Sequence, residues 1–386
     1  AVAGAAQAQS SVTVYGLLDL GYAGANQHVA QLQSATTAQQ NTTSSTFNNS
    51  PESTSRLGFK GVEDLGGGTS AFFTVETGLT PGSANFTGIN NRQSFVGLKK
   101  NGIGQFALGT QYTTVFNAVS ATDPGQLNNV VGNVIYAVSP VGGVTAINGV
   151  NGTTNSSMVT GQSDAFSSRA NQALTLNSDT FAGFQVNAMY SLQNANSTVY
   201  SSTSGGNANF NGWGLGVNYT WNKLFLTANY QALRSFATAY TSLTSPSPQA
   251  WTGPTNQGVE SQDNQTYIAG TYDFGILKAY GQWVNRKVTD ALNANYYAKR
   301  NAQQLGVRSF ITPTIEGWAS IGNGKITAFG QSNPSANFNA YQLGGNYWLS
   351  KRTNLYAIYG SSQTSSSTVF TSGSVNNYAL GLRHTF

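Results

Sequence analysis

The charged residues that could do chemistry are spaced so that they alternate with apolar residues. Arg56 and Lys60 alternate with Leu57 and Phe59, so in an extended strand the two cations point away from the apolar side chains. The same rule separates further charged residues from their apolar neighbours: Asp19, Glu76, Arg308 and Arg383. Arg92 lies near the end of its segment, and its direction is ambiguous. Fixed charges on one polar face orient water and bias the passage of ions.

Catalytic chemistry is not indicated by the residues available. The chain has two histidines, His28 in a long polar segment and His384 on the apolar side of the last alternating segment. General acid–base or nucleophilic catalysis usually recruits a histidine beside a carboxylate or serine. Cysteine is absent, so there is no thiolate site or disulfide, and no histidine cluster suggests a metal. We predict no enzymatic activity, no metal and no cofactor.

The composition indicates an all-β protein. The 386 residues include 44 glycines, 12% are aromatic and 8% are charged. We find no helical periodicity of useful length and no apolar run long enough for a membrane helix. The net charge of +5 comes from scattered residues rather than from a basic patch, which argues against nucleic-acid binding.

Sixteen alternating segments follow one another along the chain, and their connections are short and long in turn. Short turns are expected at "EDLGGG", "KKNGIG" and "IGNGK", and long loops at positions such as 23–53 and 113–166. About ten residues per segment suffice to cross a bilayer when tilted, and aromatic residues lie near the segment ends. A soluble sandwich or propeller would explain the alternation of residues but not that of the connections. The pattern predicts a sixteen-stranded antiparallel transmembrane β-barrel, because only a closed barrel satisfies every strand in lipid.

The ends of the chain carry two further expectations. Ala6-Gln7-Ala8 has the form of a signal-peptide cleavage site, so residues 1–8 are expected to be a leader remnant and 9–386 a single barrel domain. A flexible native N-terminus is the alternative. In the last segment, Tyr378, Leu380, Leu382 and Phe386 share one face, which predicts that this face meets lipid.

Several stretches resemble the general porins of Gram-negative bacteria, in particular the betaproteobacterial branch. They are "SSVTVYGLLDLGY" at 10–22, "SRLGFKGVEDLGGGTSAFFTVETG" at 55–78, "NRQSFVGLKKNGIGQFALGTQYT" at 91–113, "RANQALTLNSDTFAGFQVNAMYSL" at 169–192 and the terminal "YALGLRHTF". The resemblance covers most segments and short turns and is lost in the long loops.

The resemblance implies a homotrimer in the outer membrane, in contact with lipid and lipopolysaccharide, with short periplasmic turns and long extracellular loops. It also implies that the third long loop, 113–166, folds inward to narrow each pore, and that Phe386 belongs to a signal read by the barrel-assembly machinery. Asp123 on that loop would then face a basic wall containing Arg56 and Lys60. The function expected is passive diffusion of small hydrophilic solutes and ions, with a weak preference for anions.

Two other functions remain possible on the sequence alone. A solute-specific channel could use inward aromatic residues, Tyr280, Trp348 and Tyr356, as a stacking path for sugars or aromatic acids. A barrel enzyme such as an outer-membrane protease or phospholipase would need a catalytic histidine that neither His28 nor His384 is placed to supply.

Overall fold

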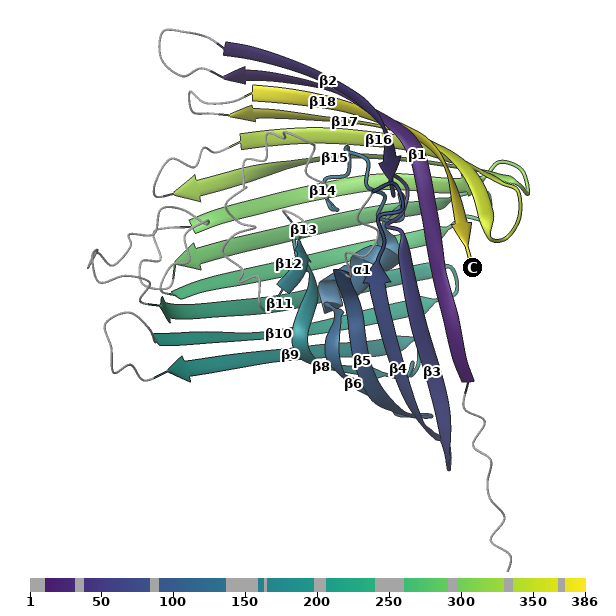
Figure 1. Ribbon diagram of the computed structural model, residues 1–386, viewed down its shortest axis with the longest axis vertical. Helices are drawn as coiled ribbons and strands as arrows, with labels where there is room; N and C mark the ends of the chain where they lie inside the picture. The colour runs from purple at the N-terminus through teal and green to yellow at the C-terminus, as the bar shows by residue number, and fades with distance from the viewer. Residues whose placement is uncertain are drawn as a thin grey trace, which may run out of the picture.

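The strands of the protein form one antiparallel sheet that closes on itself, seen in the computed structural model of Figure 1. The structure describes residues 11–31, 38–83, 90–136, 159–162, 165–197, 206–239, 260–290, 297–329, 336–366 and 372–386. The strands are β1 (Ser11–Gln31), β2 (Ala38–Asn49), β3 (Arg56–Gly66), β4 (Thr69–Gly78), β5 (Asn90–Lys100), β6 (Gly104–Tyr112), β7 (Val159–Gln162), β8 (Ser167–Ser178), β9 (Phe184–Ser197), β10 (Gly206–Trp221), β11 (Leu224–Ala239), β12 (Glu260–Asp273), β13 (Lys278–Asp290), β14 (Tyr297–Phe310), β15 (Ile315–Phe329), β16 (Ala336–Trp348), β17 (Thr353–Ser366) and β18 (Ser372–Thr385).

The long strand β1 closes the barrel. One edge of β1 pairs with β18, and the other edge pairs first with β3, over Ser11–Leu17, and then with β2, over Leu20–Gln31. Strands β2 and β3 are therefore two halves of one barrel strand, and the short β7 only pairs with the start of β8. The labelled strands thus make a barrel of sixteen, and this confirms the prediction from the alternating segments.

The two faces of the sheet differ as the alternation predicts. On β14, Leu305 and Val307 point outward and are 67% and 43% exposed, whereas Gln304 points into the barrel and is 1% exposed. A band of exposed Leu, Val, Ile and aromatic side chains is the surface that a membrane barrel presents to lipid. No helix in the described part of the chain is long and apolar enough to cross a membrane.

The predicted turn at 321–325 is wrong, because these residues lie inside β15. The actual turn between β14 and β15 is 311–314, where Pro313 has no N–H to give to a ladder and Thr312 Oγ1 accepts the Ile315 N–H at 3.0 Å. Asn323-Gly324 has the composition of a turn, but the preceding Gly322 is needed for close packing inside the barrel. A Cβ at Gly322 would collide with Val134, which belongs to the loop inside the barrel.

The predicted long loop at 23–53 is also wrong in extent. Strand β1 continues to Gln31, and β2 returns from Ala38 to Asn49. The regular ladder stops only at Ser50–Ser55, where Pro51 cannot donate a ladder hydrogen bond and Ser50 has a φ of +62°. We call residues 50–55 the wall break.

Helix α1 (Thr114–Thr122) lies inside the barrel, between the strands β3–β6 and the strands β10–β13 (Figure 1). Thr113 caps the helix, with its Oγ1 accepting the Phe116 N–H at 3.1 Å. Val115 and Val119 of the helix are fully buried against inward side chains such as Tyr267 and Val284. The segment 113–136 is thus held against the inner wall by an apolar core, which leaves its polar residues to shape the remaining opening.

Candidate functional site

A cavity of about 690 Å³ lies between the inner segment 113–136, the wall break, the strands β1, β3–β6 and β8, and the C-terminal residues Thr385 and Phe386. Its lining includes Ser53 and Thr54 of the wall break and Ser120, Gln126 and Tyr136 of the inner segment. Its charged lining residues in the described part of the chain are Arg56, Arg92, Arg169 and Glu76. We call the three arginines the arginine cluster.

Glu76 holds two of these arginines in place. Its Oε1 accepts the Arg92 Nε–H at 2.7 Å, and its Oε2 lies 3.9 Å from Arg56 Nε. The Tyr15 hydroxyl also donates to Glu76 Oε2, at 3.0 Å. One buried carboxylate therefore orients neighbouring guanidinium groups from β3 and β5 and neutralises only one positive charge.

Tyr112 fixes the far side of the cluster. Its hydroxyl accepts from Arg92 Nη2 at 2.9 Å, and its ring stacks on Phe116 of α1 with the centroids 4.3 Å apart. The Arg169 guanidinium lies 5.3 Å from the centre of the Tyr112 ring, a cation–π distance. The Arg169 Nε is buried and lacks a hydrogen-bond partner among the described residues. Arg169 is therefore held by packing and leaves hydrogen-bonding capacity unused beside the cavity.

Asp123 does not face this basic wall, contrary to expectation. Its Oδ1 accepts from Asn133 Nδ2 at 2.7 Å, and its Oδ2 accepts the Leu127 N–H at 2.8 Å. The side chain is 3% exposed. Burial raises the pKa of Asp123 above its ordinary value, and the hydrogen bonds from Leu127 and Asn133 oppose that rise. Asp123 thus shapes the bend after α1 and supplies no acidic wall opposite the arginines.

The inner segment is fastened to the opposite wall by side-chain amides. Gln342 on β16 donates to the Val130 and Val131 carbonyls at 2.5 and 2.9 Å and exchanges hydrogen bonds with Asn128. Gln304 on β14 accepts the Val134 N–H at 3.1 Å. Gly360 on the neighbouring strand β17 leaves room for this close approach, since a Cβ there would collide with the Val131 carbonyl oxygen.

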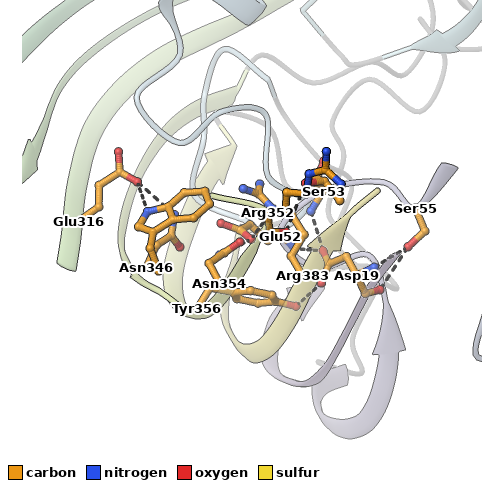
Figure 2. A network of polar contacts seen from close by, with 12 residues as sticks. Asp19, Glu52, Ser53, Ser55, Glu316, Asn346, Arg352, Asn354, Tyr356 and Arg383 are labelled. Atoms are coloured by element: carbon orange, nitrogen blue, oxygen red, sulfur yellow. Dashed lines mark hydrogen bonds and ion pairs between the residues drawn. The ribbon is translucent and has the colours of Figure 1, made fainter. Parts of the chain in front are cut away.

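A second group of charged residues lies where β1 meets β17 and β18, shown in Figure 2. We call Asp19, Glu52 and Glu316, with their bonded partners, the carboxylate network. Asp19 Oδ1 accepts from the Tyr356 hydroxyl at 2.7 Å, and its Oδ2 accepts the Glu52 and Ser53 N–H groups at 2.8 and 2.7 Å (Figure 2). Asp19 is completely buried. It thereby ties the wall break to β1 and β17.

Two arginines of the network are paired one to one with carboxylates. Arg383 Nε lies 3.5 Å from Glu52 Oε2, which also accepts from Asn354 Nδ2 at 3.0 Å. Arg308 donates to Glu316 Oε1 at 2.5 Å and to the Pro124 carbonyl at 2.8 Å. Both arginines point inward as predicted, and both stabilise the segments that fill the barrel.

Lys60 and Phe386, which were also predicted to have functional roles, both lie at exposed positions. Lys60 is exposed four residues beyond Arg56 toward the short-turn end, with its Nζ 5.3 Å from the centre of the Tyr15 ring, and it does not line the cavity. Phe386 is 43% exposed, and its N–H and C=O pair with the backbone of Gly16, where a Cβ would lie 2.6 Å from the ring. The terminal aromatic therefore covers a glycine on the closing strand.

The aromatic residues considered for a solute-specific path do not line the cavity. Tyr356 donates to Asp19, and the Trp348 indole donates to Glu316 Oε2 at 3.2 Å. Tyr280 is 9% exposed. These rings are used in wall contacts and form no continuous stacking surface along the opening.

The histidines contact neutral side chains, His28 with Asn41 and His384 with Thr353. Among the residues that the structure describes, no cluster of His, Cys, Asp and Glu could hold a metal ion.

Arg169 and Glu52 were not predicted as site residues. Arg169 shares its face with Ala173 and Thr175, opposite Leu174 and Leu176, so the alternation contained its inward direction. Glu52 follows Pro51 in an irregular stretch, where no periodicity assigns a direction.

Known proteins match both the sequence and the fold. A family profile described as Gram-negative porin matches residues 1–367. The chain is 27% identical to an outer membrane porin protein of Bordetella pertussis over 93% of its own length and 90% of the relative. It is 37% identical to outer membrane porin protein 32 of Delftia acidovorans, over 32% and 34% of the two chains.

Among solved structures, the anion-selective porin from Comamonas acidovorans superimposes with a TM-score of 0.70, at 22% identity, over 98% of this chain and all of that one. The family match spans nearly the whole chain, and the barrel has the closure, strand number and outward apolar surface of an outer-membrane channel. The chain therefore belongs to the Gram-negative porin family and is a general diffusion porin of the outer membrane.

Proposed function

We propose that small hydrophilic solutes and ions pass through the cavity beside the arginine cluster, and that this constriction gives the channel a weak preference for anions. The observation that carries the proposal is the ratio of charges in the lining, three arginines to one carboxylate. This leaves a formal excess of two positive charges where the water-filled path is narrow, so chloride is attracted and potassium is repelled.

The elements around the cavity support the same function. The apolar core behind α1 and the amide contacts to Gln342 and Gln304 hold the inner segment in a fixed position. A fixed constriction sets a size limit without a moving gate, which suits passive diffusion. The Comamonas acidovorans porin is anion-selective, and the same preference is proposed for this chain.

The test is the reversal potential of the purified protein in a planar bilayer under a potassium chloride gradient. The native channel is expected to prefer chloride, and Arg169→Gln should lower the chloride-to-potassium permeability ratio by about two- to threefold, because one unit charge near 6 Å is worth ~0.7 kcal/mol in water before salt screening. Arg169 suits the test because it forms no ion pair with the described residues, so its removal leaves no carboxylate there without a partner.

The matched control is Lys99→Gln, which removes the same charge at the short-turn end of β5. An unchanged ratio in Arg169→Gln, or an equal change in both variants, would rule out the constriction as the source of the preference.

We also propose the assembly partners that the family resemblance implies: a homotrimer, contact with lipopolysaccharide, and recognition of the terminal Phe386 by the barrel-assembly machinery. OmpT of Vibrio cholerae, an outer membrane protein of similar fold, is known in a trimer form. The exposed position of Phe386 at the seam between β1 and β18 supports its role as a signal. Cross-linking of the native membrane should give a three-chain product, and Phe386→Ser should lower the amount of inserted barrel while the protein refolded in detergent keeps its conductance.

A further inference from the structure

Two adjoining depressions lie on the outside of the barrel, on the surface that faces the membrane. The first, about 800 Å³ in volume, crosses β11–β16 at the level of the apolar band. Its floor is bare at Gly270 and Gly281, and its walls are apolar: Leu226, Ile268, Trp283, Leu305 and Ile321. The second, about 980 Å³, lies toward the long-loop end, and apart from Phe338 its side chains are amides, hydroxyls, His28 and Lys325. Both are lined by Gln303, Asn323 and Asn339, so we treat them as one feature, the outer groove.

The outward residues change in chemistry along the groove in one direction. On β14 the order is Val307, Leu305, Gln303, Asn301, Lys299, and on β15 it is Ile321, Asn323, Lys325. At about 3.3 Å per residue and a tilt of about 40°, Leu305 and Lys299 differ in depth by ~15 Å. The surface therefore passes from hydrocarbon-compatible side chains through amides to cations over the depth that separates acyl chains from headgroup phosphates.

Lys325 lines the polar end of the groove, and Lys287 and Lys299 lie beside it on the neighbouring strands β13 and β14. Lys287 of β13 pairs directly with Lys299 of β14, and Lys325 of β15 pairs with Asn301, the next outward residue below Lys299. Lysines directly opposite each other in a sheet repel. The nearest described contact is that of Lys287 Nζ, 4.9 Å from the centre of the Tyr297 ring. Within the described residues, no ion pair joins these three lysines to a carboxylate.

We propose that the outer groove binds a phosphate-bearing lipid of the outer leaflet. One acyl chain lies over Gly270 and Gly281, the amides hydrogen-bond the sugar or glycerol of the headgroup, and the lysines bind the phosphate. Phosphate supplies the anion that the paired lysines require, and a basic cluster beside a membrane surface binds anionic headgroups. The inference rests on the outer-membrane location and on the proposed contact with lipopolysaccharide, and not on the ion preference of the pore.

A second copy of the chain is a poorer occupant. It would need an acidic patch at the same depth, and the exposed carboxylates whose side chains are described, Glu63, Asp64 and Asp273, all lie at the short-turn end. Charge complementarity therefore favours a lipid over a protein neighbour on this face.

The headgroup half of the proposal is tested with the triple variant Lys287→Gln, Lys299→Gln, Lys325→Gln. The delipidated full-length protein in detergent is titrated with a bis-phosphorylated diglucosamine lipid and with its dephosphorylated form, and bound lipid is counted by native mass spectrometry. The triple variant should bind the phosphorylated lipid at least about tenfold more weakly, since it loses three cations beside the anionic headgroup, and should bind the dephosphorylated form as the native protein does. The control, Lys99→Gln, Lys100→Gln, Lys351→Gln, removes the same charge at the other end of the barrel.

The acyl half is tested with Gly281→Leu. A Cβ at Gly281 would lie 3.7 Å from Leu305 Cδ2, an ordinary contact, so the barrel tolerates a side chain that fills the groove floor. This variant should weaken binding of both lipids, whereas the lysine variant weakens binding of one.

Equal loss in the lysine variant and its short-turn control would show non-specific charge attraction and overturn the proposal. Unchanged lipid binding, or a change only in the oligomeric state, would also overturn it, the latter in favour of a second copy. Neither variant alters the cavity lining, so single-channel conductance and reversal potential should stay native and keep this test separate from that of the pore.

Discussion

The arginine cluster and the carboxylate network use the same residue types on the same inner surface, yet their charge ratios differ. In the cavity, Arg56 and Arg92 share the single carboxylate Glu76, and Arg169 has no ion pair among the described residues. In the network, Arg383 is paired with Glu52 (Figure 2), and Arg308 is paired with Glu316. The difference teaches that an inward charge is not by itself a pore charge. Where each cation has its own carboxylate, the pair stabilises the wall, and where cations outnumber carboxylates, a field remains in the water.

The largest effect is expected from breaking the network at Asp19. Asp19→Ala removes the acceptor for the Tyr356 hydroxyl and for two N–H groups of the wall break, all in a fully buried place. Leaving such donors without partners should cost about 3 kcal/mol in the free energy of unfolding, measured by urea titration of the refolded barrel. The released wall break should also become sensitive to protease and add noise to the open channel.

Asp64→Ala is the control for that measurement. Asp64 also accepts a backbone N–H, from Gly66 at 2.9 Å, but it is exposed in a short turn. A similar loss of stability in both variants would mean that the network is no more important to the wall than an ordinary turn.

A smaller effect is expected from pushing the inner segment away from the network side. Gly360→Ala places a methyl group against the Val131 carbonyl oxygen, which belongs to the peptide backbone and cannot rotate away. Overpacking of this kind costs about 1–3 kcal/mol, and the shifted segment should change the single-channel conductance. Gly345→Ala, where a Cβ would lie 3.4 Å from the Glu316 carbonyl oxygen, should leave conductance native. Equal conductance in both variants would contradict the close fit described here.

The fold was accessible from sequence because alternation is a local property. In lipid each barrel strand must present one apolar face. Alternating apolar residues such as Leu305 and Val307 therefore predict both the strand and the face that points outward. The turn between β14 and β15 was misplaced because Asn323-Gly324 has the composition of a turn. The preceding Gly322 instead leaves room for Val134, about 190 residues earlier in the chain, and a local pattern contains no information about so distant a contact.

The candidate site was accessible only in part, for the same reason. The alternation of polar and apolar residues correctly predicted that Arg56, Glu76 and Arg308 point inward. The same rule would have predicted this for Arg169. Alternation does not predict whether an inward charged side chain is exposed to water or paired with another side chain. That depends on where the inner segment lies, and Asp123 is buried because Leu127 and Asn133 fold back onto it. Irregular segments such as 50–55 have no periodic pattern, so the inward direction of Glu52 could not be predicted from the sequence.

The smallest effect sharpens the comparison within the basic wall itself. Arg56 lines the cavity. Lys60 is four residues further along β3 on the same face and is exposed outside the cavity. Arg56→Gln should lower the chloride-to-potassium permeability ratio by about two- to threefold, whereas Lys60→Gln should change it by less than about 1.3-fold, because open solvent and salt screen a charge beyond the constriction. Reversal potentials at low and high salt measure both. If Lys60→Gln matched Arg56→Gln, the ion preference would arise from the summed charge of the inner face and not from the excess of arginines over carboxylates in the cavity lining.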